Sequence, residues 1–219
     1  MQHQPRRAEI RRGRRVVAGG RLPGLAARAI VVPTAPQRSS LIRRIFPWIS
    51  GAVLLGCAAL PFPARYNTLL GAMFFLPLFD RAWALPHLPR ERSHIIAWAV
   101  LLVVAVIPTI WTPGYAALLL SNLLLVALPE EWFFRAYFMK RVTQGWRANL
   151  FASLLFSLTH GVSLGWQTGI LVFVPSLLFG WLYQRTRDLP LVVLIHALSN
   201  LMFILVLAKP LATWLATWL

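Results

Sequence analysis

Long apolar stretches separated by short polar connections dominate the chain from about residue 45 onward. Most of them approach the roughly 20 residues that a helix needs to cross the apolar core of a bilayer. The pattern predicts membrane-crossing helices in seven places, near residues 46–63, 67–80, 94–111, 115–134, 148–163, 168–185 and 190–208. The second is short and could be tilted or re-entrant. The predicted fold class is therefore all-α, a polytopic membrane bundle of about seven helices.

The two ends of the chain depart from this pattern. Residues 1–44 hold eleven arginines and a single acid, with no helical or strand period, which is typical of a disordered basic tail. The segment 209–219 contains two tryptophans and is expected to lie at the membrane interface, where Trp is enriched. Between these ends we expect a first group of helices over 45–114 and a second group over 115–208.

The composition also indicates a protein built for lipid. Only 13% of the residues are charged, 58% are hydrophobic, and the mean hydropathy is +0.64. Soluble domains carry about 25% charged and about 45–50% apolar residues. The net charge of +16 does not indicate a nucleic-acid partner, because much of it lies in the N-terminal tail. Cys57 is the only cysteine, which excludes a disulfide within the chain and a thiolate metal site.

The placement of Lys and Arg predicts an orientation. If the basic tail lies inside, the outer connections 112–114 and 161–169 contain no cation, and only Arg65 and Lys209 lie on the wrong side. The inner connections then hold Arg81, Arg90, Arg92, Lys140, Arg141, Arg147, Arg185 and Arg187. A Lys/Arg bias of this kind sets the orientation of membrane proteins. We therefore expect the N-terminus in the cytoplasm.

A few ionisable residues remain at membrane depth, where a charge costs about 2.5–3.5 kcal/mol on insertion scales and therefore suggests a function. They are Glu130, Glu131, Arg135, His160 and His196, with Asn122 and Asn200 as neutral companions. Glu131 and Arg135 are four residues apart, so they share a helix face and can form an ion pair. Glu130 lies about 100° further round the helix with no cation one turn away. It is thus free for another role, although the group could also be a purely structural charge cluster.

Two histidines add to this picture. His160 continues a polar stripe formed by Ser153 and Ser157, and His196 shares a helix face with Asn200. A single buried histidine is usually a satisfied core residue. Two of them on separate helices, each with small polar neighbours, instead favour a site.

The depths of these residues predict that they meet. Counted from the cytoplasmic ends of their helices, Glu130 lies about 15 Å in, His160 about 18 Å, and His196 and Asn200 about 9 and 15 Å. A carboxylate and a histidine can share a water and activate it as a nucleophile. A histidine and an asparagine amide can stabilise an oxyanion. Together these groups would make a hydrolase that needs no serine, cysteine or obligatory metal.

The three motifs resemble those of the CPBP family of intramembrane proteases, which includes CAAX prenyl endopeptidases of the Rce1 type and bacterial Abi proteins. They are Glu130-Glu131-x-x-x-Arg135, Phe156-x-x-x-His160 and His196-x-x-x-Asn200, within about residues 115–207. The resemblance implies a glutamate-dependent peptidase without a cofactor, in which Glu130 is the base and His160 also contacts the catalytic water. His196 and Asn200 would form the oxyanion hole, and Glu131 and Arg135 would be structural support. It also implies a protein or peptide substrate and a location in a bacterial inner membrane.

Other functions use the same residues. Glu130, His160 and His196 could bind Zn²⁺ in a zinc-dependent membrane protease, although the sequence has no HExxH motif. A proton-coupled transporter could use a Glu/His relay, although no internal repeat is seen. A haem-binding membrane anchor could use the two histidines as axial ligands, but this would leave the Glu-Glu-Arg group unexplained.

Overall fold

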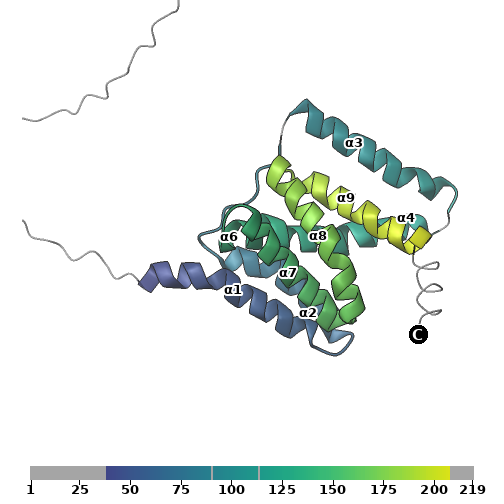
Figure 1. Cartoon of the computed structure of the whole chain (residues 1–219). Helices are drawn as coiled ribbons and strands as arrows, with labels where there is room; N and C mark the ends of the chain where they lie inside the picture. Colours follow the sequence, from purple (N-terminus) through teal and green to yellow (C-terminus); the bar gives the residue numbers. More distant parts are fainter. Residues whose placement is uncertain (1–37, 90, 113, 208–219) are drawn as a thin grey trace, which may run out of the picture. The chain divides into compact units, whose positions relative to one another are not determined.

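The computed structural model describes residues 38–89, 91–112 and 114–207, and in this part of the chain it contains helices and no β-strand (Figure 1). The N-terminal helices are α1 (Arg38–Ala58), α2 (Ala64–Phe79) and α3 (Arg92–Val106), which continues as the 3-10 turn η1 (Ile107–Ile110). A long central segment contains α4 (Tyr115–Ser121), η2 (Asn122–Ala127), α5 (Leu128–Glu131), η3 (Trp132–Met139) and α6 (Lys140–Val142). It is followed by α7 (Trp146–Leu164), α8 (Trp166–Thr186), α9 (Leu189–Met202) and η4 (Phe203–Leu207). The all-α prediction is confirmed.

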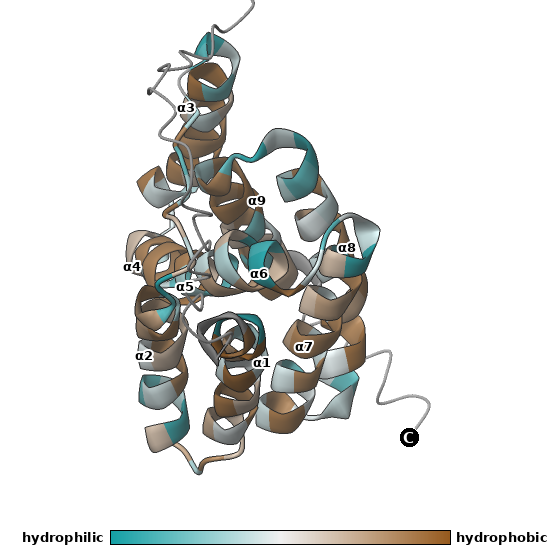
Figure 2. Ribbon diagram, turned by 90° about the vertical axis from the view of Figure 1, so that its left-hand side faces the viewer, coloured by the Kyte–Doolittle hydropathy of each residue, from teal (hydrophilic) through white to brown (hydrophobic). Residues whose placement is uncertain are grey.

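Within the described residues, four helical segments are long and apolar enough to cross a membrane: Leu41–Ala58, Arg92–Ile110, Tyr115–Val142 and Trp166–Thr186. Leu189–Leu205 is a shorter apolar helix. Large apolar side chains such as Phe75, Val103 and Ile170 are exposed on the outside of the bundle, as in a protein surrounded by lipid. Figure 2 shows hydrophobic colouring over most of α1 and α3. The chain is an integral membrane protein.

Polar contacts hold together the helix ends that carry Lys and Arg side chains. The Arg141 side chain pairs through Nε with Oδ2 of Asp80, just after α2, and donates through Nη2 to the carbonyl oxygen of Arg43 in α1, both at 2.8 Å. The Gln184 side chain of α8 donates to the carbonyl oxygen of Gly145, which precedes α7, at 2.7 Å. The connections predicted to share one side of the membrane therefore lie together. That this side is cytoplasmic stays a prediction.

Helix α3 is joined to the same end of the bundle. The buried Asp188 carboxylate caps α9 by accepting from the backbone N–H of Leu191 at 2.9 Å. It also contacts His94 Nδ1 and accepts from Trp98 Nε1 at 2.9 and 3.0 Å. Figure 1 shows α3 beside α9 at the edge of the bundle.

Three helix boundaries differ from the sequence prediction. Helix α1 begins at Arg38, inside the range 1–44 assigned to the tail, because the apolar face of the membrane helix continues through Leu41 and Ile42. The central segment stays helical to Val142 rather than leaving the bundle after 134, because residues 133–139 are all buried. Residues 1–37 and the whole of the segment 209–219 lie outside the described part.

The third difference is the turn between α7 and α8. The expected connection 161–169 is reduced to Gly165, whose positive φ of 98° lies in the region that favours glycine. The two backbones then run in close contact, since a Cβ added at Gly169 would lie 2.8 Å from the carbonyl oxygen of Ser157. The Ser157 hydroxyl donates to the carbonyl oxygen of Gly169 at 2.6 Å, which closes the pair. Small residues commonly permit such close packing in membranes.

The central segment is irregular where the two glutamates lie. Asn122–Ala127 and Trp132–Met139 are π-helical, and Leu128–Glu131 lies between them as a short α-helical piece. Pro129 has no N–H to donate to the preceding turn, which interrupts the regular hydrogen bonding there. π-Helical turns are frequent at functional sites and change the direction in which neighbouring side chains point.

Candidate active site

The Glu131–Arg135 ion pair is a deeply buried polar contact. Arg135 Nε lies 3.1 Å from Glu131 Oε2, and both side chains are almost fully buried, with 1% and 0% exposed. The Arg135 guanidinium also donates through Nη2 to the carbonyl oxygen of Ser176 at 3.0 Å and to its hydroxyl at 2.9 Å. Its Cζ lies 5.0 Å from the centre of the Phe156 ring, a cation–π distance. The i, i+4 pairing expected from the sequence is present, and Ser176 of α8 reinforces it.

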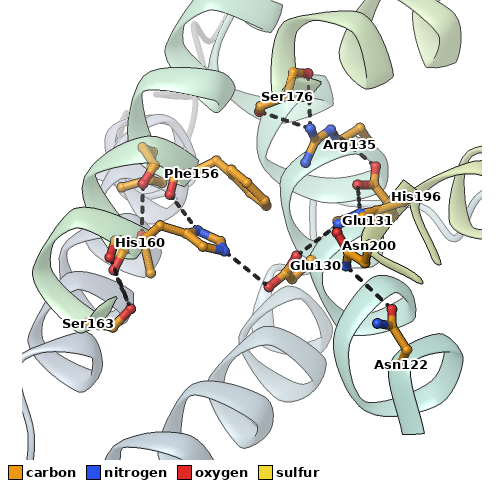
Figure 3. A network of polar contacts seen from close by, with 12 residues as sticks. Asn122, Glu130, Glu131, Arg135, Phe156, His160, Ser163, Ser176, His196 and Asn200 are labelled. Carbon is orange, nitrogen blue, oxygen red and sulfur yellow. Dashed lines mark hydrogen bonds and ion pairs between the residues drawn. The ribbon is translucent and has the colours of Figure 1, made fainter. Parts of the chain in front are cut away.

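His196 lies between the two glutamates (Figure 3). Its Nδ1 is 2.7 Å from Glu131 Oε1, and its Nε2 is 3.5 Å from Glu130 Oε2. The imidazole also stacks on the Phe179 ring, with centroids 4.8 Å apart. The short contact to a carboxylate means that Nδ1 carries a hydrogen, so only Nε2 remains to act on another group.

Glu130 is held much more loosely than Glu131. Its Oε1 is 3.7 Å from His160 Nε2, beyond hydrogen-bonding distance. Its Oε2 is buried, yet no described residue donates a hydrogen bond to it. Separations of this length can be bridged by a water or by a reacting group, and catalytic contacts are often long before substrate binds.

The orientation of His160 comes from Phe156, one turn earlier on α7. His160 Nδ1 lies 2.9 Å from the carbonyl oxygen of Phe156, and the two rings stack with centroids 4.2 Å apart. A carbonyl oxygen can only accept, so Nδ1 carries the hydrogen. In the neutral ring Nε2 is then an acceptor, and this nitrogen faces Glu130. The Phe-x-x-x-His spacing thus determines which histidine nitrogen can accept a proton.

Asn200 completes the group from the next turn of α9. Its Nδ2 donates to Oδ1 of Asn122, a buried residue of η2, at 3.3 Å. One N–H of the Asn200 amide remains for another partner, since the side chain has two donors. Asn122 stood out in the sequence only as a neutral companion. In the structure it orients Asn200.

The side chains of Glu130, His160, His196 and Asn200 line one cavity of about 690 Å³. Most of its other walls are apolar and come from α8 and η4, including Leu171, Val172, Pro175, Phe179 and Phe203. Concave sites with apolar walls and a few convergent polar groups are typical of ligand-binding pockets. The arrangement could hold an apolar peptide segment against a carboxylate and three polar side chains. The structure brings the four predicted catalytic residues together, and their chemical roles stay a prediction.

Two features of the site were not visible in the sequence. The contact between Glu131 and His196 joins residues 65 positions apart, and the contact between Arg135 and Ser176 joins residues 41 apart. Conversely, Ser153 and Ser157 of the polar stripe bond to Asn149 and to the Gly169 carbonyl rather than lining the cavity. These two serines hold α7 in place, with Ser157 bonding directly to α8.

A zinc site would need three ligands from the same group of side chains. In the part of the chain that the structure describes, no group of three His, Cys, Asp or Glu side chains is arranged to hold a metal ion. One nitrogen of each histidine is already engaged, by Phe156 and by Glu131.

Comparison with known proteins agrees with the resemblance in the sequence. Residues 112–202 match the family model described as type II CAAX prenyl endopeptidase Rce1-like. Searches of curated proteins and of solved structures found no match. The matched segment contains all three motifs and Ser176, and it supports a protease of the CAAX endopeptidase type. Residues 112–202 of this integral membrane protein are therefore similar to the Rce1-like family of type II CAAX prenyl endopeptidases.

Proposed function

We propose that this protein is a glutamate-dependent intramembrane endopeptidase with Glu130 as its general base. The observation that carries the proposal is the Glu130 carboxylate, loosely held 3.7 Å from the acceptor nitrogen of His160 and lining an apolar cavity. Its neighbour Glu131 forms an ion pair with Arg135 through Oε2 and a 2.7 Å contact with His196 through Oε1. Processing of a CAAX-type C-terminus, a leader peptide or a C-terminal sorting signal would each be compatible with such a site.

In this mechanism a water lies between Glu130 and His160 and donates one hydrogen to each. Its oxygen attacks the carbonyl carbon of the scissile bond while Glu130 takes a proton. A C–O bond forms, and the carbonyl oxygen becomes an oxyanion. When the C–N bond breaks, Glu130 returns the proton to the leaving amine. General-base catalysis of this kind typically contributes about 10²–10⁴-fold.

His196 and Asn200 would stabilise the oxyanion. Asn200 has a second amide N–H available, and His196 can donate from Nε2 only when both of its nitrogens carry hydrogens. Its two nitrogens lie 2.7 Å from Glu131 and 3.5 Å from Glu130.

The decisive experiment measures peptide cleavage by the purified protein after exhaustive chelation, with and without added Zn²⁺. Cleavage that survives chelation is the expected result. Activity that disappears on chelation and returns with zinc would show that the protein is a metalloprotease that uses these residues as zinc ligands.

The physiological substrate can be sought by comparing the membrane proteome of a deletion strain with that of a Glu130→Ala strain. A precursor that accumulates in both is the expected signature.

The orientation is part of the proposal. The N-terminus would lie in the cytoplasm of a bacterial cell, with the cation-bearing helix ends facing the same compartment. Reporter fusions after Gly114 and Gly165 should then report an external location. A cytoplasmic signal at either position would contradict this orientation.

A further inference from the structure

A separate cavity, of about 560 Å³, lies at the cation-bearing end of the bundle. It shares no lining residue with the cavity of the candidate active site. Its walls come from the loop after α2, from the end of the central segment, from the start of α7 and from the end of α8. The hydrogen bond from Gln184 to the carbonyl oxygen of Gly145 joins two of these walls, because both residues line the cavity.

The cavity is lined by cations without a counter-ion. Lys140 and Arg187 line it together with the imidazole of His87, and none of the described lining residues is acidic. The three side chains come from α6, from the turn between α8 and α9, and from the loop after α2. Lys140 and Arg187 are exposed, and neither forms an ion pair with a described carboxylate. Positive side chains that converge on one hollow raise the local concentration of anions.

The other polar groups around the cavity suit an anion with several oxygens. The hydroxyl of Thr143 and the amide of Gln144 line it and can each donate. The first turn of α7 borders it through Gly145 and Ala148, and no side chain caps this helix. A phosphate presents acceptor oxygens in several directions, so it can use donors from separate elements at once. The donor set therefore favours a phosphate group.

Two exposed tryptophans indicate the depth of the cavity in the membrane. Trp146 begins α7 at the cavity wall, and Trp181 lies two residues before Tyr183, which also lines the cavity. The guanidinium groups of Arg147 and Arg185 lie 5.7 and 5.8 Å from the centres of these two rings. Trp is enriched at the level of the lipid headgroups. Basic pockets between membrane helices bind anionic headgroups.

We propose that this cavity binds a phosphate group, supplied by the headgroup of an anionic lipid in the adjacent leaflet. The bound phosphate joins three segments that carry active-site residues. Lys140 follows the central segment with the two glutamates, Ala148 lies in the first turn of α7, and Arg187 directly precedes the Asp188 cap of α9. An anion held by all three stabilises their arrangement, since a ligand that binds only the folded state stabilises it. This inference does not depend on proteolysis.

The test uses the full chain purified in an uncharged detergent and titrated with phosphatidylglycerol, phosphatidylcholine or inorganic phosphate. Native mass spectrometry gives the Kd of the lipids, and thermal unfolding gives the stabilisation by each ligand. Phosphatidylglycerol should bind and raise the unfolding midpoint, whereas phosphatidylcholine, which has no net charge, should do neither. Each Lys or Arg near a membrane surface strengthens binding of anionic lipid about fivefold, so Lys140→Gln/Arg187→Gln should raise the Kd about 25-fold.

The matched control is Arg147→Gln/Arg185→Gln, which removes the same charge from two exposed arginines that do not line the cavity. An equal loss of binding in both double variants would reveal general charge attraction and overturn the site. The exchange Lys140→Arg/Arg187→Lys keeps both charges and should keep the binding; a loss as large as that of the Gln pair also overturns it.

Inorganic phosphate distinguishes the source of the anion. It should stabilise the wild-type protein far less than phosphatidylglycerol at the same concentration. Equal stabilisation by the two would assign the cavity to a soluble phosphate compound and overturn the lipid proposal. No readout in this experiment is cleavage, so an inactive protein that still binds phosphatidylglycerol through Lys140 and Arg187 would contradict only the proposed function.

Discussion

The two adjacent glutamates of the central segment occupy opposite kinds of environment. Glu131 is fully buried, contacts Arg135 at 3.1 Å and His196 at 2.7 Å, and belongs to a network that extends to α8. Glu130, the preceding residue, lies 3.5 and 3.7 Å from two histidines and lines the apolar cavity. Glu131 is therefore paired with a cation and with a histidine, whereas Glu130 has no contact as short as either of these.

This difference separates positioning from chemistry within a single helical turn. A buried charge is tolerated when it is paired and hydrogen-bonded, and removing one partner is strongly destabilising. A general base must take up a proton, so its carboxylate cannot already be tied up in an ion pair and hydrogen bonds before the substrate binds. Substitution of Glu131 or its partners should therefore lower mainly the stability of the protein, whereas substitution of Glu130 should lower mainly its activity.

The largest effect is expected from Glu130→Gln. The amide keeps the shape of the side chain but cannot act as a base, so turnover should fall by at least about 10²–10⁴-fold. The midpoint of thermal unfolding should change little, because no described residue donates a hydrogen bond to Glu130 Oε2. Peptide cleavage and thermal unfolding are measured on the same preparation, with exposed Glu91→Gln as the control. A fully active Glu130→Gln protein would remove the basis of the proposed mechanism.

Arg135→Ala should act in the opposite way. It leaves the fully buried Glu131 carboxylate without its cation, a loss of about 3–5 kcal/mol in the free energy of unfolding. The expected result is a large fall in the yield of folded protein, measured by size-exclusion chromatography of the detergent-solubilised membrane fraction. Arg147→Ala, which removes an exposed arginine, is the control and should leave the yield unchanged. Normal yield with lost cleavage would place Arg135 in the chemistry instead.

Asn200→Ala should reduce the rate without abolishing it. Removing one oxyanion donor costs about 10²–10³-fold in kcat, and the second donor remains. The kinetic constants of cleavage are compared with those of Asn67→Ala, which changes an exposed asparagine of α2. A rise in KM at constant kcat would contradict the oxyanion role and indicate that Asn200 only binds the substrate.

The smallest effect is expected from Ser176→Ala. The substitution removes one of the two acceptors that α8 offers to Arg135 Nη2 and leaves the backbone carbonyl in place. A hydrogen bond to a charged group contributes about 1.5–3 kcal/mol, so the unfolding free energy should fall by an amount near the lower end. Thermal unfolding beside Ser121→Ala, an exposed serine, measures the difference. Cleavage by the folded fraction should be unchanged.

Much of this architecture was readable from the pattern of residues along the chain. Apolar runs of near-membrane length predicted the helices, because an apolar segment in lipid must satisfy its own backbone hydrogen bonds. The spacing of Glu131 and Arg135 predicted their pairing, since residues four apart in a helix share a face. Counting residues from the helix ends also predicted that Glu130, His160, His196 and Asn200 reach one depth. These inferences depend only on helical geometry within single segments.

The remaining features required the packed structure. The placement of His196 between two glutamates and that of Ser176 under Arg135 each depend on how separate helices are rotated and how closely they approach. Sequence periodicity describes the faces of one helix but does not determine which faces of different helices meet. The π-helical turns around Glu130 and the close contact of α7 with α8 at Gly169 make those rotations specific to this fold. The pairing of Glu131 with Arg135 follows from their spacing, but the partners that each glutamate meets on other helices were decided by tertiary packing.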